Sequence, residues 1–171
     1  YKIKFKSRVY TPLNNSEKYT LVLMGRADFG LLGSYNKYKQ TPFETFHVGG
    51  DGMTGSYTYA TETIGLRGYD NGALTPYSDG RAYTRFSMEL HFPFLLQPSS
   101  TIYGLAFVEG GNAWTSLENF NPFSLKRSAG VGVRIFLPMI GLMGIDWAYG
   151  FDKVQGEKGG GHFHFILGQE F

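Results

Sequence analysis

Hydrophobic and polar residues alternate along most of the chain with a period of two, the pattern of β-strands that have one apolar face. In 81–92, Phe86, Met88 and Leu90 lie on one face, while Arg85 and Glu89 lie on the other. Similar alternation predicts eight strands, at 1–11, 17–32, 41–48, 81–93, 101–114, 125–138, 142–152 and 161–171. Most of them are longer than the roughly 5–6 residues of an average strand.

Two all-β architectures produce such a pattern. A soluble sandwich buries the apolar face against a second sheet, whereas a membrane barrel turns it to lipid and keeps a polar lumen. Strand length favours the barrel, because a tilted strand needs about 9–11 residues to cross a bilayer. Aromatic residues near predicted strand ends also favour it, as expected for interfacial girdles: Tyr10, Trp114, Tyr149 and Phe171.

The predicted links also differ in length, as in outer-membrane barrels, where the turns are short on one side and the loops longer on the other. We expect extracellular loops at 12–16, 49–80, 115–124 and 153–160. We expect periplasmic turns at 33–40, 94–100 and 139–141. The long loop 49–80 then lies outside the cell.

Composition agrees with an all-β protein that has an apolar exterior: 17% of residues are aromatic, 24 are glycine and only 18% are charged. The net charge of +2 does not suggest a nucleic-acid partner. With no cysteine, the chain has no disulfide and no thiolate metal site. Because the sequence starts at Tyr1 without a signal peptide, we expect a mature form or an excised fragment.

Several segments resemble the BamA family, the barrel subunits of the outer-membrane β-barrel assembly machinery. "TPFETFHVGGDGMTG…TIGLRGY" is similar to the family's long sixth extracellular loop, and Leu66, Arg67, Gly68 and Tyr69 resemble its Val/Ile-Arg-Gly-Phe/Tyr motif. "YGLAFVEGGNAW" resembles the strand whose acidic residue meets the motif arginine, with Glu109 where the family usually has aspartate. The segments 128–152 and 163–171 resemble the final strands.

The resemblance implies that residues 1–171 are the C-terminal half of a sixteen-stranded antiparallel transmembrane β-barrel in the bacterial outer membrane. It implies a non-enzymatic insertase whose partners are outer-membrane lipids, nascent β-barrel clients and the lipoproteins of an assembly complex. The missing N-terminal half-barrel, or a second copy of the chain, would complete the wall. A related translocation barrel for secretion, or one resembling TamA, is an alternative, as is a small self-closed eight-stranded barrel.

The alternation also argues for a contact between Arg67 and Glu109. Tyr103, Leu105, Phe107 and Glu109 share one strand face, and a carboxylate facing lipid is costly, so this face should point into the lumen. An inward Glu109 needs a basic partner, which Arg67 supplies if its loop folds back. Gly65 and Gly68 would give the loop backbone room, and Tyr69 would pack beside Phe107. The alternative is a solvated Arg67, with Glu109 paired to another lumenal base.

A folded-back loop also bears on barrel size, because an eight-stranded barrel is filled by its own side chains. Alternation already turns eight basic residues inward: Lys2, Lys4, Lys6, Arg8, Arg26, Arg81, Arg85 and Arg134. A loop of this length does not fit beside them, so half of a larger barrel is expected. Self-closure stays open if the loop remains outside.

The last predicted strand would form the seam of an incompletely closed barrel. Its candidate seam residues are Phe163, Phe165, Leu167, Gly168 and Phe171, and the resemblance implies that the terminal Phe171 also serves as a sorting signal. Gly159–Gly161 and Gly168 would loosen pairing at a seam that opens. Equally, these glycines could belong to a loop and a crowded, curved wall.

No catalytic residue, metal site or cofactor is expected. His162 and His164 lie on one strand face, but no third ligand accompanies them, so they are interpreted as polar lumenal residues. His91 with Glu89 or Asp28 lacks the nucleophile motif of a hydrolase.

Overall fold

The computed structural model describes residues 1–14, 16, 19–35, 44–52, 61–75, 77, 79–97, 100–154 and 159–168. Every regular element in these ranges is a β-strand. In the same ranges there is no helix with the length and apolar character needed to span a membrane.

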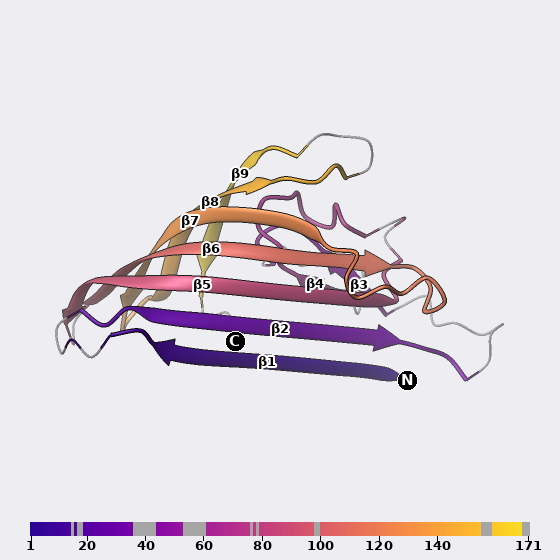
Figure 1. The fold of residues 1–171 in the computed structure, drawn as a ribbon, viewed down its shortest axis with the longest axis horizontal. Coiled ribbons are helices and arrows are strands. Elements are labelled where there is room, and N and C mark those ends of the chain that lie inside the picture. Colours follow the sequence, from indigo (N-terminus) through magenta and orange to yellow (C-terminus); the bar gives the residue numbers. More distant parts are fainter. Residues whose placement is uncertain are drawn as a thin grey trace.

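Seven strands form one antiparallel sheet in which every neighbour in space is also the next of these seven along the chain. In order, they are β1 (Lys2–Pro12), β2 (Val22–Leu32), β5 (Ala82–Gln97), β6 (Ser100–Trp114), β7 (Lys126–Leu137), β8 (Gly141–Gly150) and β9 (Gly161–Leu167). The sheet curves strongly, with β1 at one edge and β9 at the other (Figure 1). The two edges are not paired within the described residues, so this all-β sheet is an open portion of a barrel wall, as the sequence predicts.

The two faces of the sheet differ as the alternation predicts. Apolar side chains stand exposed on the outer face, including Val131 at 56% and Phe163 at 69% of full exposure. Polar and charged side chains are buried on the inner face, including Glu109, Arg134 and Asp146. Because the outer apolar residues are exposed, no second sheet covers them in the described structure, and the sandwich alternative is excluded.

Two small residues at the start of β5 differ from the rest of the outer positions. Ala82 and Thr84 are fully buried, and they lie opposite the larger Trp114 and Phe29 in the strand register. Alternation predicts which way a side chain points, but neighbouring bulk decides how far a small side chain is covered.

The prediction that 41–48 is a wall strand is wrong. The described part of it, β3 (Thr45–Val48), pairs in parallel with β4 (Thr61–Ile64) in a separate two-stranded sheet. Residues 41–43 lie outside the described residues. Alternation reports that a segment is extended but not which sheet it joins, and Phe46 and Val48 are buried within the loop's own core.

This difference changes the link assignments at the start of the chain. The loop between β2 and β5 spans 33–81 rather than 49–80, and it leaves the same end of the sheet as 115–125 and 151–160. The link 13–21 lies at the opposite end, so placing 12–16 beside the long loop is wrong, as is placing 33–40 away from it. One strand too many in the wall reverses the side of every link that precedes it.

The turn predicted at 94–100 is also shorter than expected. β5 continues to Gln97 past a register shift between Pro93 and Leu95, and β6 begins at Ser100. Proline inside a sheet is found at such irregularities because it cannot donate a ladder hydrogen bond.

Replacing Val131 with arginine tests whether the outer face contacts lipid. We expect Val131→Arg to lower the free energy of unfolding of the intact protein in vesicles by about 2–4 kcal/mol, because arginine at mid-bilayer depth on a barrel exterior is costly. The measurement is denaturant unfolding, with Glu118→Arg in the exposed 115–125 loop as the control. A loss below about 0.5 kcal/mol, typical of a water-exposed surface site, would contradict a lipid-facing wall.

Candidate functional site: a loop arginine bound to the inner face of the sheet

The described parts of loop 33–81 fold back on the inner face of the sheet and are held there by an apolar core. Phe46 packs edge-to-face against Tyr83 of β5, with ring centroids 4.7 Å apart. Nine buried residues make up the core: Leu32, Phe46, Val48, Ile64, Leu66, Tyr69, Leu74, Tyr83 and Ala113. Since Leu32, Tyr83 and Ala113 belong to β2, β5 and β6, this core fixes the loop against three wall strands.

Arg67 follows directly after the buried Leu66, and its guanidinium is bound by carboxylates from three strands. Nη2 lies 2.6 Å from Oε1 of Glu109 on β6, and Nη1 lies 2.9 Å from Oδ2 of Asp146 on β8. Nη2 also donates to Glu89 of β5. The backbone N–H of Arg67 donates to the second oxygen of Glu109 at 2.9 Å. One loop residue therefore connects β5, β6 and β8.

The ring of Phe107 supports the same guanidinium from one side. Cζ of Arg67 lies 3.5 Å from the Phe107 ring centroid, a cation–π contact that gains strength where water is excluded. Both residues are buried, Arg67 at 6% and Phe107 at 3% exposure. Phe107 and Glu109 share the inner face of β6, so a single strand supplies both the ring and a carboxylate.

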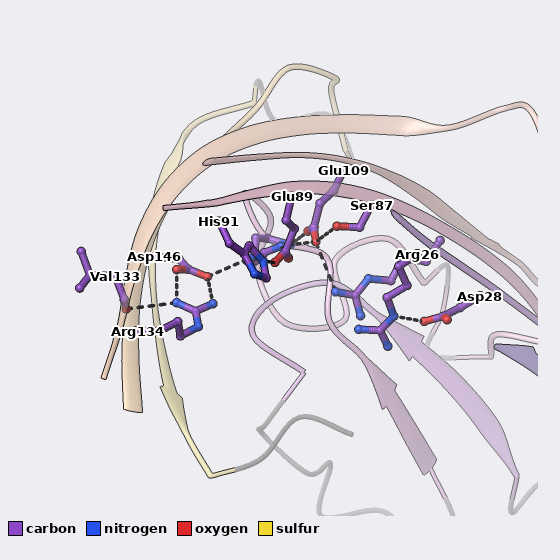
Figure 2. A network of polar contacts seen from close by, with 11 residues as sticks. Arg26, Asp28, Ser87, Glu89, His91, Glu109, Val133, Arg134 and Asp146 are labelled. Atoms are coloured by element: carbon purple, nitrogen blue, oxygen red, sulfur yellow. Dashed lines mark hydrogen bonds and ion pairs between the residues drawn. The ribbon is translucent and has the colours of Figure 1, made fainter. Parts of the chain in front are cut away.

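Two further arginines balance the acidic residues around Arg67. Arg85 Nη2 lies 3.3 Å from Glu109, and Arg134 binds Asp146 through two hydrogen bonds of 2.5 and 2.7 Å. Ser87 donates to Glu109 at 3.0 Å, and His91 contacts Glu89 at 2.9 Å (Figure 2). Three arginines thus face three carboxylates, which avoids leaving a buried charge unpaired.

The charge of Arg67 is permanent in this setting. Burial alone would lower the pKa of the Arg67 guanidinium, but Glu109, Glu89 and Asp146 raise it well above its ordinary value. The contact therefore does not switch with pH through titration of the arginine.

Gly68 allows the loop backbone to touch the wall. It has φ +89°, and a Cβ built there would lie 2.8 Å from Cβ of Ser128 and 3.0 Å from the backbone nitrogen of Gly150. Gly150 is equally restricted, since its own Cβ would lie 2.4 Å from the Gly68 carbonyl oxygen. Gly65, by contrast, faces Asp51 within the loop, so only Gly68 gives the close approach expected of both glycines.

Tyr69 lies elsewhere than expected. Its ring belongs to the loop core and its hydroxyl donates to the Arg127 carbonyl at 2.6 Å, whereas Phe107 belongs to a different apolar cluster. The guanidinium of Arg67 covers Phe107, the role expected for Tyr69. Burial raises the pKa of the Tyr69 hydroxyl above its ordinary value.

Most of the predicted basic residues of the lumen form ion pairs. Glu62 of β4 meets Lys2, Lys4 and Lys6 of the edge strand β1, at 3.0–3.7 Å. Burial alone would raise the pKa of Glu62, but Lys4 and Lys2 outweigh it and lower that pKa below its ordinary value. Arg26 and Arg81 pair with Asp28 and Asp79.

The predicted seam residues that the structure describes lie at the edge strand β9. Phe163, Phe165 and Leu167 point to the outer face at 69%, 62% and 65% exposure. Gly168 has φ +95° and donates from its backbone to Leu142 at 2.8 Å. Phe171 lies outside the described residues. None of these residues contacts the Arg67 cluster in the described structure, so the predicted sites form two groups on opposite faces of the sheet.

Three inner-face residues escaped the sequence-based site prediction: Glu89, Asp146 and His164. Alternation already assigns them to the inner face, on three different strands, which is the available signal. Only the strand register and the curvature bring Glu89 and Asp146 to the same guanidinium, and neither can be obtained from spacing along the chain.

The charged groups around Arg67 are engaged with one another. No group of three or more potential metal ligands occurs in the described parts of the chain. His91 is engaged by Glu89, and no hydroxyl group of the described residues is hydrogen-bonded to its ring. What the arrangement does physically is fasten a long loop to the inside of the sheet.

The match to known proteins agrees with this geometry. A model of the Omp85 superfamily domain matches residues 1–171. The chain belongs to the Omp85 superfamily. The family and the fold together place this chain in the bacterial outer membrane.

The fold of this chain is similar to that of a solved structure. The crystal structure of BamA from Haemophilus ducreyi lacking POTRA domains 1–3 superposes with a TM-score of 0.61 at 19% sequence identity. The match covers 96% of this chain and 34% of that chain. This chain therefore spans about a third of the length of that crystallised chain and corresponds to part of its barrel.

A double-mutant cycle tests the energetic coupling of Arg67 and Glu109. We expect Arg67→Ala to lower the free energy of unfolding of the intact protein by about 3–5 kcal/mol, because it leaves buried carboxylates short of a cation. Glu109→Ala should be less costly in the Arg67→Ala background than alone, with a coupling of about 1–3 kcal/mol. Denaturant unfolding of the four proteins measures it. A simple charge exchange is unsuitable, because Glu89 and Asp146 would remain around the new carboxylate. Additive effects would contradict the contact.

Alanine at Gly68 tests the close approach of loop and wall. Gly68→Ala must adopt a strained φ and also displace Ser128 and Gly150, so we expect a loss of about 2–4 kcal/mol. Gly72→Ala is the matched control: φ is +71° there, but the nearest atom to the added Cβ is a His47 ring nitrogen at 3.3 Å. It should lose only the strain energy of about 1–2 kcal/mol. Equal losses in unfolding free energy would show that Gly68 does not touch the wall.

Proposed function

We propose that the protein containing this chain is an outer-membrane assembly factor that folds β-barrel proteins and inserts them into the outer membrane. Its mechanism would be strand templating at a lateral seam formed by β9. One observation carries the proposal: β9 is the edge of an open sheet, paired with β8 from Tyr149↔Gly161 to Met143↔Leu167 and with no strand on its other side in the described structure. Such edges present unpaired backbone groups that recruit further strands.

The side chains of β9 suit an incoming membrane strand. Phe163, Phe165 and Leu167 already face outward, where lipid would be. A client strand that pairs with β9 in the same pleat would place its own apolar residues on the lipid side, because side chains on adjacent paired strands share a face. The template would thus impose both hydrogen-bond register and orientation.

The Arg67 cluster would give the template a firm support. It links β5, β6 and β8, while no ion pair joins β9 to this cluster among the described residues. The wall behind the seam is therefore cross-linked from inside, and the backbone groups on the outer edge of β9 stay available to an incoming strand. The predicted roles of Leu66, Arg67, Gly68, Tyr69, Phe107 and Glu109 as a lumenal latch belong to this proposal.

The alternatives have less support. A translocation channel lined by basic residues would need free cations, but Lys2, Lys4, Lys6, Arg26, Arg81, Arg85 and Arg134 all form ion pairs. A self-closed small barrel would require β1 to pair with β9, and these strands are the two unpaired edges of the described sheet.

The proposed partners follow from the two edges and the outer face. Outer-membrane lipids would cover the apolar exterior, and nascent β-barrel clients would meet β9. The N-terminal half-barrel, or a second copy of the chain, would pair with β1. The lipoproteins of an assembly complex are proposed as further partners because the chain resembles the BamA family.

Reconstitution tests the proposed function. We expect the intact parent protein in lipid vesicles to accelerate the folding of a urea-unfolded outer-membrane barrel client, measured by protease protection and heat-modifiable gel migration. Pro substitution at Phe165 should reduce that acceleration more than Pro at Met139, which is 98% exposed in the turn between β7 and β8, because proline removes a backbone donor from a strand. Single-channel conductance without client acceleration would support translocation instead.

A further inference from the structure

The inner side of β9 is bound by the segment 68–70 of loop 33–81. His164 is buried, and its Nε2 accepts a hydrogen bond of 3.0 Å from the backbone N–H of Gly68. Two residues earlier on the same strand face, Nδ1 of His162 lies 3.2 Å from Oδ1 of Asp70. The loop segment 68–70 therefore runs alongside 162–164, with one contact at each end.

We propose that His164 and His162 are positioning residues that couple the edge strand β9 to the Arg67 loop. Gly68 is adjacent to Arg67, so the same few loop residues bind β5, β6 and β8 through the guanidinium and β9 through the Gly68 N–H. If β9 moves away from the sheet, either the His164 contact must break or segment 68–70 must move with the strand. The two predicted groups on opposite faces of the sheet are linked through this strand.

The two histidine contacts depend on pH in opposite ways. Nε2 of His164 must be unprotonated to accept from Gly68, so the imidazolium form, which carries hydrogen on both nitrogens, cannot make this bond. The His162–Asp70 contact has the opposite dependence, because protonation of His162 turns it into an ion pair. Acidification therefore weakens one end of the coupling and strengthens the other.

Several charged groups face His164 from the surrounding elements. Asp146 of β8 lies opposite it in the strand register. Arg67 and Asp51 of the loop and His162 of β9 also interact with it electrostatically. The two carboxylates favour the protonated imidazole, while Arg67 and a protonated His162 oppose it. The burial of His164, together with these four groups, sets the pH at which the contact breaks.

The contact also satisfies the buried backbone N–H of Gly68. A side chain there would collide with Ser128 and Gly150. The buried backbone N–H of Gly68 donates to Nε2 of His164. A buried N–H without an acceptor would be costly, so His164 satisfies a donor that the close approach of the loop to the wall creates.

Hydrogen exchange on the intact protein in vesicles, followed by mass spectrometry without any client, tests the coupling. We expect His164→Phe, which keeps a ring but removes the acceptor, to raise exchange by about tenfold in both 66–70 and 161–167. His164→Gln should preserve protection, because its amide oxygen accepts the same bond without titrating. Phe165→Leu, on the outer face of the same strand, should leave exchange at 66–70 unchanged.

The pH dependence of hydrogen exchange separates a hydrogen-bonding role of His164 from a role in packing alone, because packing alone would not change with pH. After correction for intrinsic exchange rates, protection of 66–70 in a His162→Gln background should fall as the pH is lowered below about 6.5, the ordinary pKa of a histidine, and should stay constant once His164→Gln is added. Unchanged exchange at 66–70 in His164→Phe would overturn the coupling. So would equal losses in the Phe and Gln variants, because the acceptor would then not be responsible.

The inference rests on the proposed function only in naming β9 as the strand that moves. Exchange is measured without client, so a native protein that fails to accelerate client folding would contradict the insertase proposal and leave the exchange result intact. Conversely, normal client folding with no exchange response would overturn the coupling alone.

Discussion

The structure depends on a buried guanidinium that no single strand could hold. Arg67 lies among Glu89, Glu109 and Asp146, which come from β5, β6 and β8. An arginine in a water-poor interior is acceptable only when carboxylates with good geometry surround it. Two neighbouring arginines, Arg85 and Arg134, keep those carboxylates from being in excess. The loop and the wall are thus mutually required, because either one alone leaves charge uncompensated.

This mutual requirement shapes the rest of the fold. The loop needs an apolar core of its own to bring Arg67 to the right depth, and Phe46, Val48 and Leu66 supply it. It needs a backbone without a side chain where it touches β7 and β8, and Gly68 meets Gly150 there. The edge strand β9 receives the next loop residues through His164 and His162. A rigid interior and an unpaired edge are therefore neighbours, which is the combination that a strand-templating machine would use.

Much of this architecture can be predicted from the sequence, for a simple physical reason. Alternation is a local property, so it correctly turns Val131 outward and Glu109 inward, and it shows that an inward Glu109 needs a basic partner. It cannot say which sheet a strand joins, so it wrongly predicts a wall strand at 41–48, although Thr45–Val48 pairs with β4. The convergence of Glu89 and Asp146 on Arg67 depends on register and curvature across several strands. So does the position of Tyr69, which packs in the loop core while Arg67 covers Phe107.

Density from electron cryomicroscopy of the intact protein in lipid nanodiscs tests the central claim most directly. The account predicts loop 33–81 inside the barrel, with Arg67 side-chain density continuous with Glu109 and Asp146 and resting on Phe107. A loop that extends into solvent outside the barrel, with Glu109 and Asp146 bound only to Arg85 and Arg134, would contradict it.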